Sequence, residues 1–194
     1  MDGTGKLELT GSLGDVMKES AHAAITYARQ VADQYGISSD FYTKKDIHIH
    51  FPEGAVPKDG PSAGVTTLTA LISALSGIPV RRDISMTGEI TIRGNVLAIG
   101  GLREKTMAAY SAGVRTIIIP ADNLKDLDKV DPVVRENVTF VPCRRVSEVL
   151  TAALACLPCE DGNIKCADTS EVSQSPAFIP TPKVRTRAEA KKKH

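Results

Sequence analysis

The stretch PKDGPSAG at residues 57–64 carries the most information about the fold and chemistry of this chain of 194 residues. It places Ser62 between a glycine-proline turn and a long apolar segment that predicts a helix over residues 62–76. At a helix N-terminus, unpaired N–H groups point outward and favour negative charge. This geometry suits a nucleophile whose attack creates an oxyanion. A simpler interpretation is that Ser62 only caps the helix, and the stretch alone does not decide between the two.

Three further stretches accompany it: LTGSLGDVMKESA at residues 9–21, MTGEI at 86–90 and GGLREKTMAA at 100–109. In this order, the four segments resemble the proteolytic domain of the ATP-dependent Lon proteases, and the likeness runs from about residue 3 to about residue 155. The resemblance implies an α/β (α+β) domain with the Lon proteolytic-domain fold, which is related to domain 2 of ribosomal protein S5.

The same resemblance implies roles for particular residues. Ser62 would be the nucleophile and Lys105 its general base, with Thr87 hydrogen-bonded to the lysine and holding its amine toward the serine. For Thr87, the alternative is a β-branched residue that only favours a strand. Backbone N–H groups around Ser62 and Ala63 would form the oxyanion hole, and Gly60 would let the substrate backbone approach closely.

Lys105 can remove a proton only in its neutral form, and the ordinary pKa of lysine is about 10.4. Burial among apolar groups lowers that pKa. Neighbours such as Leu102 and Met107, together with the dipole at the start of the predicted helix, favour a neutral amine. The alternative is a solvent-facing lysine paired with Glu104 or Glu89.

Asp59 stands three positions before Ser62. It would either gate the site through a charge contact with Lys105 or shape the turn. A carboxylate held permanently beside the lysine would raise its pKa and impede the base. An active conformation should therefore keep Asp59 away from Lys105.

His48 and His50 share one face of a predicted strand with Asp46, which raises the alternatives of a histidine-based triad or a metal site. The resemblance instead makes His48, His50 and Glu89 candidates for polar positions on the substrate side of the site, with no metal. It leaves packing roles for three other motif residues, which are Met17, Glu19 and Met86.

The composition is that of an ordinary soluble domain, with 42% hydrophobic residues, 24% charged residues and a net charge of +1. This balance gives no electrostatic case for a nucleic-acid or membrane partner. No apolar run approaches the roughly 18 residues of a membrane span, and the N-terminus lacks the features of a signal peptide. We therefore expect a cytoplasmic protein, with the mitochondrial matrix as the alternative.

Four cysteines lie late in the chain, at positions 143, 156, 159 and 166. Cys156 and Cys159 form a CxxC pair, which allows a zinc or redox interpretation. A zinc site of this type needs a second pair or nearby histidines, and neither is present. The sequence therefore predicts reduced thiols.

We expect one domain over residues 1–157, which lacks the N-terminal β edge of the family. For residues 158–194 we expect a disordered polar tail. Helices are expected at 15–35, 62–76, 102–112, 122–129 and 146–157. Strands are expected at 7–10, 46–51, 116–119 and 138–141, with several short ones and a hairpin turn at residues 93–95 between 84 and 99. This alternation favours a layered α/β domain. No GxxxxGK[ST] loop occurs, so ATP and Mg²⁺ would belong to an ATPase module outside this chain.

The resulting hypothesis is a serine endopeptidase that degrades unfolded, damaged or regulatory proteins through an acyl-enzyme at Ser62, without a metal or organic cofactor. The resemblance implies a hexameric ring in the full enzyme. Two alternatives remain open, namely a catalytically silent Lon-like scaffold that binds partners and a zinc hydrolase built on His48 and His50.

Overall fold

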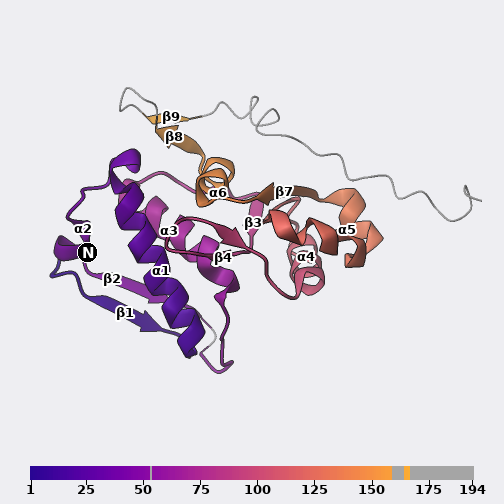
Figure 1. The fold of residues 1–194 in the computed structure, drawn as a ribbon, viewed down its shortest axis with the longest axis horizontal. Coiled ribbons are helices and arrows are strands. Elements are labelled where there is room, and N and C mark those ends of the chain that lie inside the picture. The colour runs from indigo at the N-terminus through magenta and orange to yellow at the C-terminus, as the bar shows by residue number, and fades with distance from the viewer. Residues whose placement is uncertain (53, 159–163, 167–194) are drawn as a thin grey trace, which may run out of the picture.

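The computed structural model describes residues 1–52, 54–158 and 164–166. Helices and strands alternate along the chain (Figure 1). The strands are β1 (Leu7–Thr10), β2 (Ile47–His50), β3 (Ile84–Met86), β4 (Glu89–Ile90), β5 (Val96–Leu97), β6 (Thr116–Pro120), β7 (Thr139–Cys143), β8 (Cys156–Pro158) and β9 (Ile164–Cys166). The α-helices are α1 (Asp15–Val31), α2 (Phe41–Lys44), α3 (Gly64–Ser76), α4 (Leu102–Ser111), α5 (Pro132–Asn137) and α6 (Val146–Ala153), and the 3₁₀-helices are η1 (Ala32–Tyr35), η2 (Pro61–Ala63) and η3 (Ala121–Lys129).

The N-terminal unit is a parallel pair of strands, β1 and β2, joined through α1. In β2, Ile47 and Ile49 are half-buried while His48 and His50 are exposed, as the alternating sequence predicts. The predicted helix at residues 15–35 is confirmed as α1 followed by η1, and it ends at Gly36 in a left-handed conformation. Only glycine adopts that conformation without a steric cost, so the residue marks the end of the helix.

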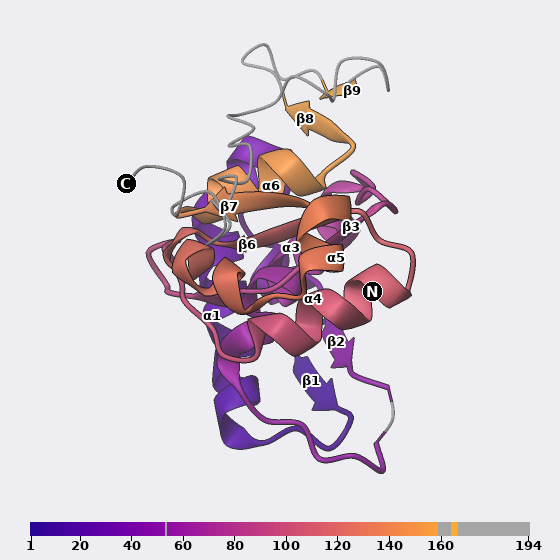
Figure 2. The same cartoon turned by 90° about the vertical axis from the view of Figure 1, so that its right-hand side faces the viewer.

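A three-stranded parallel sheet, in the order β3-β6-β7, forms the centre of the domain. Its middle strand β6 is a buried apolar run, which is typical of a parallel strand covered on both faces. Ile118 belongs to one core with residues of α1, α3 and α6, whereas Ile117 and Ile119 belong to a second core with residues of α4, η3 and α5. The sheet therefore separates two helical layers, and Figure 2 shows α6 of the first layer above the strands and α4 of the second layer below them.

Several boundaries differ from the sequence-based expectations. The helix expected to reach residue 157 ends at Ala153, and β8 then pairs antiparallel with β9. The short helices α2 and α5 were not expected, and the helix expected at 122–129 is the 3₁₀-helix η3. Most of the tail predicted at 158–194 lies outside the described residues, so its disorder stays a prediction. Within the described part, no helix is long and apolar enough to cross a membrane.

The cysteines also differ from expectation. Cys143 is buried and free, and burial, followed by the nearby Glu148 carboxylate, raises the pKa of its thiol to about 12. Cys156 takes part in a disulfide bond, so the prediction of reduced thiols is wrong for this residue. It lies at the start of β8, opposite Cys166 of β9 in the strand register. The short hairpin of β8 and β9 was not expected from the sequence.

Candidate active site

Ser62 and Lys105 come from different helical layers and meet at one point. Ser62 lies in the turn η2 directly before α3, and Lys105 lies in the first turns of α4. The Nζ atom of Lys105 is 2.7 Å from the Oγ atom of Ser62, although the residues are 43 positions apart in the chain. At this distance an ammonium group donates to the hydroxyl oxygen, and a neutral amine can accept the hydroxyl proton. The geometry is therefore that required of a nucleophile and its base.

The backbone at Gly60 explains the shape of the turn that carries Ser62. Its φ of 131° and ψ of 155° lie in a region that essentially only glycine occupies. An added Cβ would meet no atom within 4 Å, so glycine is required by conformation and not by lack of space. Pro61 follows at the first helical position, where its fixed φ and missing N–H cause no loss.

The carbonyl group of Ser62 accepts two hydrogen bonds from the segment before β4. The Gly88 N–H donates at 2.9 Å and the Thr87 hydroxyl donates at 3.3 Å. Thr87 therefore contacts the peptide group of Ser62, whereas the resemblance implied a bond to the amine of Lys105. Its backbone N–H is bound to Ile118 of β6, which holds the residue on the Ser62 side. Thr87 thus connects the central sheet to the turn that carries Ser62.

Ser20 provides a further contact that the sequence did not single out. Its hydroxyl donates to the carbonyl of Pro61 at 3.4 Å, so α1 also holds the turn. A Cβ on Gly64 would lie 3.0 Å from that hydroxyl oxygen, which shows how closely α1 approaches the start of α3. Ser20 belongs to the MKESA stretch, and this membership was the only signal in the sequence that could have identified it.

The surroundings of Lys105 are partly as expected. Burial lowers the pKa of Lys105 below the ordinary value of 10.5, and the amine forms no ion pair with Glu104, Glu89 or any other carboxylate in the described part of the chain. As a whole residue, however, Lys105 is exposed. Leu102 and Thr106, four positions apart on one helical face, point into the core and leave Lys105 on another face. The predicted apolar shelter is therefore incomplete.

Asp59 binds the N-terminus of α1, although it lies 42 positions further along the chain than Met17. Its Oδ1 atom accepts hydrogen bonds from the N–H groups of Met17, at 3.1 Å, and Gly60, at 2.9 Å. Met17 lies in the first turn of α1, where a carboxylate is favoured by unpaired N–H groups. A Cβ on Gly14 would come within 2.3 Å of the Asp59 carboxyl carbon, so this contact needs a glycine. Of the two expected roles for Asp59, the structure has it in the one that shapes the turn.

His48, His50 and Glu89 lie apart from these contacts. Both histidine rings bond the hydroxyl of Thr10 on β1, at 2.8 and 2.7 Å, and neither bonds Ser62 or Lys105. Glu89 is half-buried in β4, opposite Leu97. Among the described residues, no three His, Cys, Asp or Glu side chains form a cluster that could hold a metal. The zinc-hydrolase alternative therefore finds no ligand set there.

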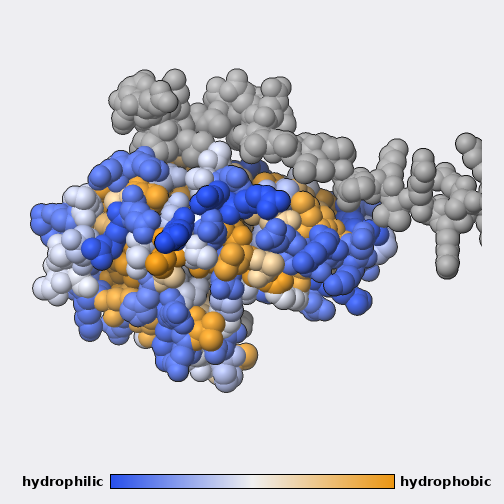
Figure 3. Space-filling model, in the orientation of Figure 1, coloured by the Kyte–Doolittle hydropathy of each residue, from blue (hydrophilic) through white to orange (hydrophobic). Residues whose placement is uncertain are grey.

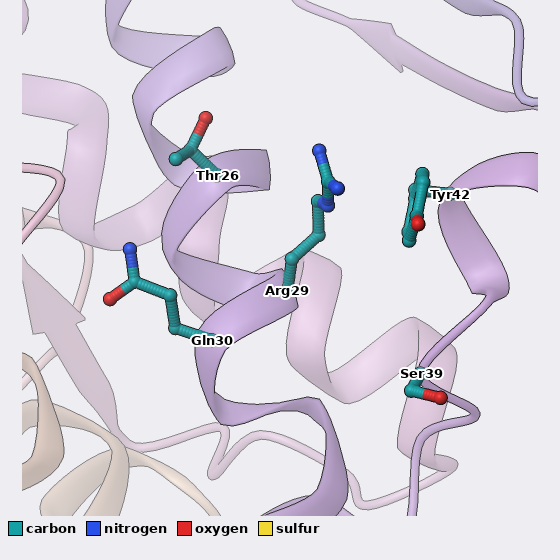
Figure 4. A pocket seen from close by; sticks show the side chains of 5 residues that line it. All are labelled: Thr26, Arg29, Gln30, Ser39 and Tyr42. Carbon is teal, nitrogen blue, oxygen red and sulfur yellow. The ribbon is translucent and has the colours of Figure 1, made fainter.

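Elsewhere, an open hollow of about 360 Å³ lies between α1 and the segment around α2 (Figure 4). The Arg29 guanidinium stacks 3.6 Å from the centre of the Tyr42 ring, and the Gln30 amide donates to the carbonyl of Ile92. The hollow contains neither Ser62 nor Lys105. On the face shown in Figure 3, hydrophobic residues form small groups among hydrophilic ones.

Comparison with known proteins agrees with the fold. The model of the family described as the Lon protease (S16) C-terminal proteolytic domain matches residues 1–156. A Lon protease of Brevibacillus choshinensis is 59% identical over 82% of this chain and 20% of its own length. The Lon protease of Bacillus thuringiensis (strain Al Hakam) is 62% identical over 78% of this chain and 19% of its own length. Lon protease 1 of Bacillus subtilis (strain 168) is 59% identical over 78% of this chain and 20% of its own length. The chain spans about a fifth of the length of these relatives, and it belongs to the family of Lon protease C-terminal proteolytic domains.

Proposed function

We propose that the chain is a serine endopeptidase in which Ser62 and Lys105 form a catalytic dyad. The observation that carries the proposal is the distance of 2.7 Å between the lysine amine and the serine hydroxyl. Two further features support it. Burial lowers the pKa of Lys105, and several backbone hydrogen bonds hold the turn that presents Ser62.

In the proposed reaction, the Ser62 oxygen attacks the carbonyl carbon of a peptide bond while the neutral amine of Lys105 takes the hydroxyl proton. The tetrahedral intermediate then expels the amine of the leaving chain, which receives its proton from the Lys105 ammonium. An ester at Ser62 remains. Water attacks this ester with Lys105 again as the base, and the product acid leaves with Ser62 restored.

The oxyanion would be held by backbone donors at the turn. In a 3₁₀-helix each N–H bonds the carbonyl three residues earlier, so in η2 the Ala63 N–H faces the carbonyl of Gly60. The Ser62 N–H precedes the first such bond, which makes it the donor that the turn leaves available. We therefore assign the Ser62 N–H as the first member of the oxyanion hole, with the Ala63 N–H joining it if the turn opens on substrate.

The substrates that fit this proposal are unfolded, damaged or regulatory proteins and peptides derived from them. The relatives are named Lon proteases, and by this analogy we propose that the chain works in a hexameric ring in the bacterial cytoplasm. An ATPase module would use ATP and Mg²⁺ to deliver the substrate. The chemistry proposed at Ser62 draws on no metal or organic cofactor.

The test is cleavage of an unfolded protein and a fluorogenic peptide by the chain and its Ser62→Ala and Lys105→Ala variants. Each variant should lose about 10⁴-fold in kcat/KM, because removing one member of such a catalytic unit costs nearly as much as removing all of it. Exposed residues outside the site supply the matched controls Ser39→Ala and Lys125→Ala, which should keep the activity of the parent.

Labelling with a serine-directed phosphonate separates the peptidase from a silent scaffold. The parent chain should be modified at Ser62, and Lys105→Ala should react far more slowly while its melting temperature stays close to that of the parent. If the folded parent neither cleaves nor reacts, the scaffold alternative gains support. Normal turnover by Ser62→Ala or Lys105→Ala would refute the dyad.

A further inference from the structure

Asn123 is a polar side chain buried beneath the helix that carries Lys105. It is 1% exposed, and its amide forms three hydrogen bonds. The Oδ1 atom accepts from the Ile99 N–H at 2.9 Å, and the Nδ2 atom donates to the Ile99 carbonyl at 2.9 Å and to Asp126 Oδ2 at 2.9 Å. Both backbone groups of Ile99 are thus paired with one side chain, in the way a neighbouring strand would pair with them.

Ile99 begins the segment that leads into α4. Two glycines follow it, and Gly101 adopts a left-handed φ of 69° as the residue before the helix. Gly101 supplies no capping side chain, and its carbonyl accepts the first helical bond from the N–H of Lys105 at 3.1 Å. Glycines restrict the backbone weakly. The position of Lys105 therefore depends on what holds the chain on each side of the two glycines. Before them it is the pair of hydrogen bonds at Ile99, and after them it is the burial of Leu102 and Thr106 in α4.

The 3₁₀-helix η3, which carries Asn123, is held in the second core. Asn123 lies in η3, immediately after the central strand β6. Leu127 of η3 packs in the second core with Ile117 and Ile119 of β6 and with Leu102 of α4. Asn123 therefore links the most buried strand of the sheet to the start of the lysine helix. A buried amide with all three bonds made fixes geometry, because breaking any one of them leaves a polar group unpaired.

We propose that Asn123 is a positioning residue for Lys105, and that its paired bonds to Ile99 place the lysine amine against the hydroxyl of Ser62. This inference rests on the proposed function, since it assigns to Asn123 a part in that same site. Asn123 touches neither the nucleophile nor the base. It acts through the backbone between Ile99 and Lys105.

The test compares Asn123→Ala and Asn123→Asp with Val134→Ala. The aspartate substitution keeps the size and one acceptor but removes both donated bonds. Val134 of α5 is fully buried in the core against which Ile99 packs. Its truncation destabilises that core but removes neither hydrogen bond between Asn123 and Ile99. Melting temperatures are measured for each variant, and kcat and KM are determined at a temperature where all are folded.

Both Asn123 variants should lose about 10-fold to 100-fold in kcat with little change in KM, because small displacements of a reacting group cost this much. The rise of kcat with pH should also move to higher pH, since a displaced amine is less well shielded from water. Val134→Ala should lower the melting temperature and leave the pH profile unchanged. Amide hydrogen exchange should show faster exchange at Ile99 and residues 100–102 in the Asn123 variants only.

Two results would overturn the inference. One is a loss of kcat in the Asn123 variants no larger than that of Val134→Ala at an equal drop in melting temperature. The other is a pH profile identical to that of the parent. If the carboxylate of Asn123→Asp, buried beside Asp126, prevents folding, Asn123→Ala and the exchange measurement still decide. Because Lys105→Ala is assayed beside them, its inactivity together with normal Asn123 variants would reject this inference alone, whereas an active Lys105→Ala would reject the dyad itself.

Discussion

The partial exposure of Lys105 makes a prediction about pH. Burial lowers the pKa of its amine, yet the residue remains exposed to water in this chain. A bound peptide would cover the amine and replace water beside it, which disfavours the ammonium further. The pKa of Lys105 should therefore be lower in the complex with substrate than in the free protein.

The magnitude follows from the proton equilibrium. At pH 7.5, a lysine with the ordinary pKa of 10.5 is neutral in about one molecule in a thousand. Each unit by which the pKa falls raises this fraction tenfold and corresponds to about 1.36 kcal/mol. Activity must rise with pH, because only the neutral amine can accept the proton of Ser62.

The assay is the pH dependence of kcat and of kcat/KM on a fluorogenic peptide, since the first reports the complex and the second the free enzyme. The rising limb of kcat should lie at lower pH than that of kcat/KM. Lys125→Ala, an exposed lysine outside the site, should leave both limbs in place. If kcat and kcat/KM rose over the same pH range, the idea that bound substrate further shields the Lys105 amine from water would be refuted. A limb near the ordinary histidine pKa of about 6.5 that vanishes in His48→Ala or His50→Ala would instead make a histidine the base.

Two further predictions concern the turn that carries Ser62. Thr87→Val removes the donor to the Ser62 carbonyl while keeping the side-chain shape, so kcat should fall by about 5-fold for a lost hydrogen bond of about 1 kcal/mol. Thr87→Ser should restore kcat, and equal activity of both variants in steady-state assays would exclude the contact as a positioning element. Asp59→Asn keeps an oxygen that can accept hydrogen bonds from the N–H groups of Met17 and Gly60, so peptidase activity should be retained or increased. Asp59→Ala should lower both the melting temperature and kcat/KM. Complete loss of activity in Asp59→Asn would show that the negative charge itself is needed.

The sequence predicted the elements of the fold well where a local physical signal existed. Gly36, Gly77 and Gly113 follow helices and adopt the positive φ that such positions favour, and the alternation at residues 46–51 is that of a half-exposed strand. The pairing of Ser62 with Lys105 could be predicted only from the resemblance. Spacing along the chain says nothing about a contact across two layers of the domain.

The remaining features depend on contacts between distant segments. The short helices α2 and α5, with 4 and 6 residues, are too brief to show a helical period. Asp59 was expected either to contact Lys105 or to shape the turn, and its partners are the backbone N–H groups of Gly60 and Met17. The contact with Met17 of α1 forms only when the loop folds against Gly14. Lys105 has apolar neighbours in sequence, yet the helix turns Leu102 and Thr106 away from it into the core.

The side chains that were missed or assigned another partner share one property, which is that they bind backbone groups. Ser20 and Thr87 donate to the carbonyls of Pro61 and Ser62, and Asn123 pairs with both backbone groups of Ile99. A side chain that hydrogen-bonds a backbone group leaves no pattern in the sequence, because almost every residue carries the same backbone N–H donor and C=O acceptor. We infer that polar contacts from α1, from the segment before β4 and from η3 set the distance between Ser62 and Lys105. Substitutions at these contacts should therefore change the rate of the reaction even where the two reacting side chains stay intact.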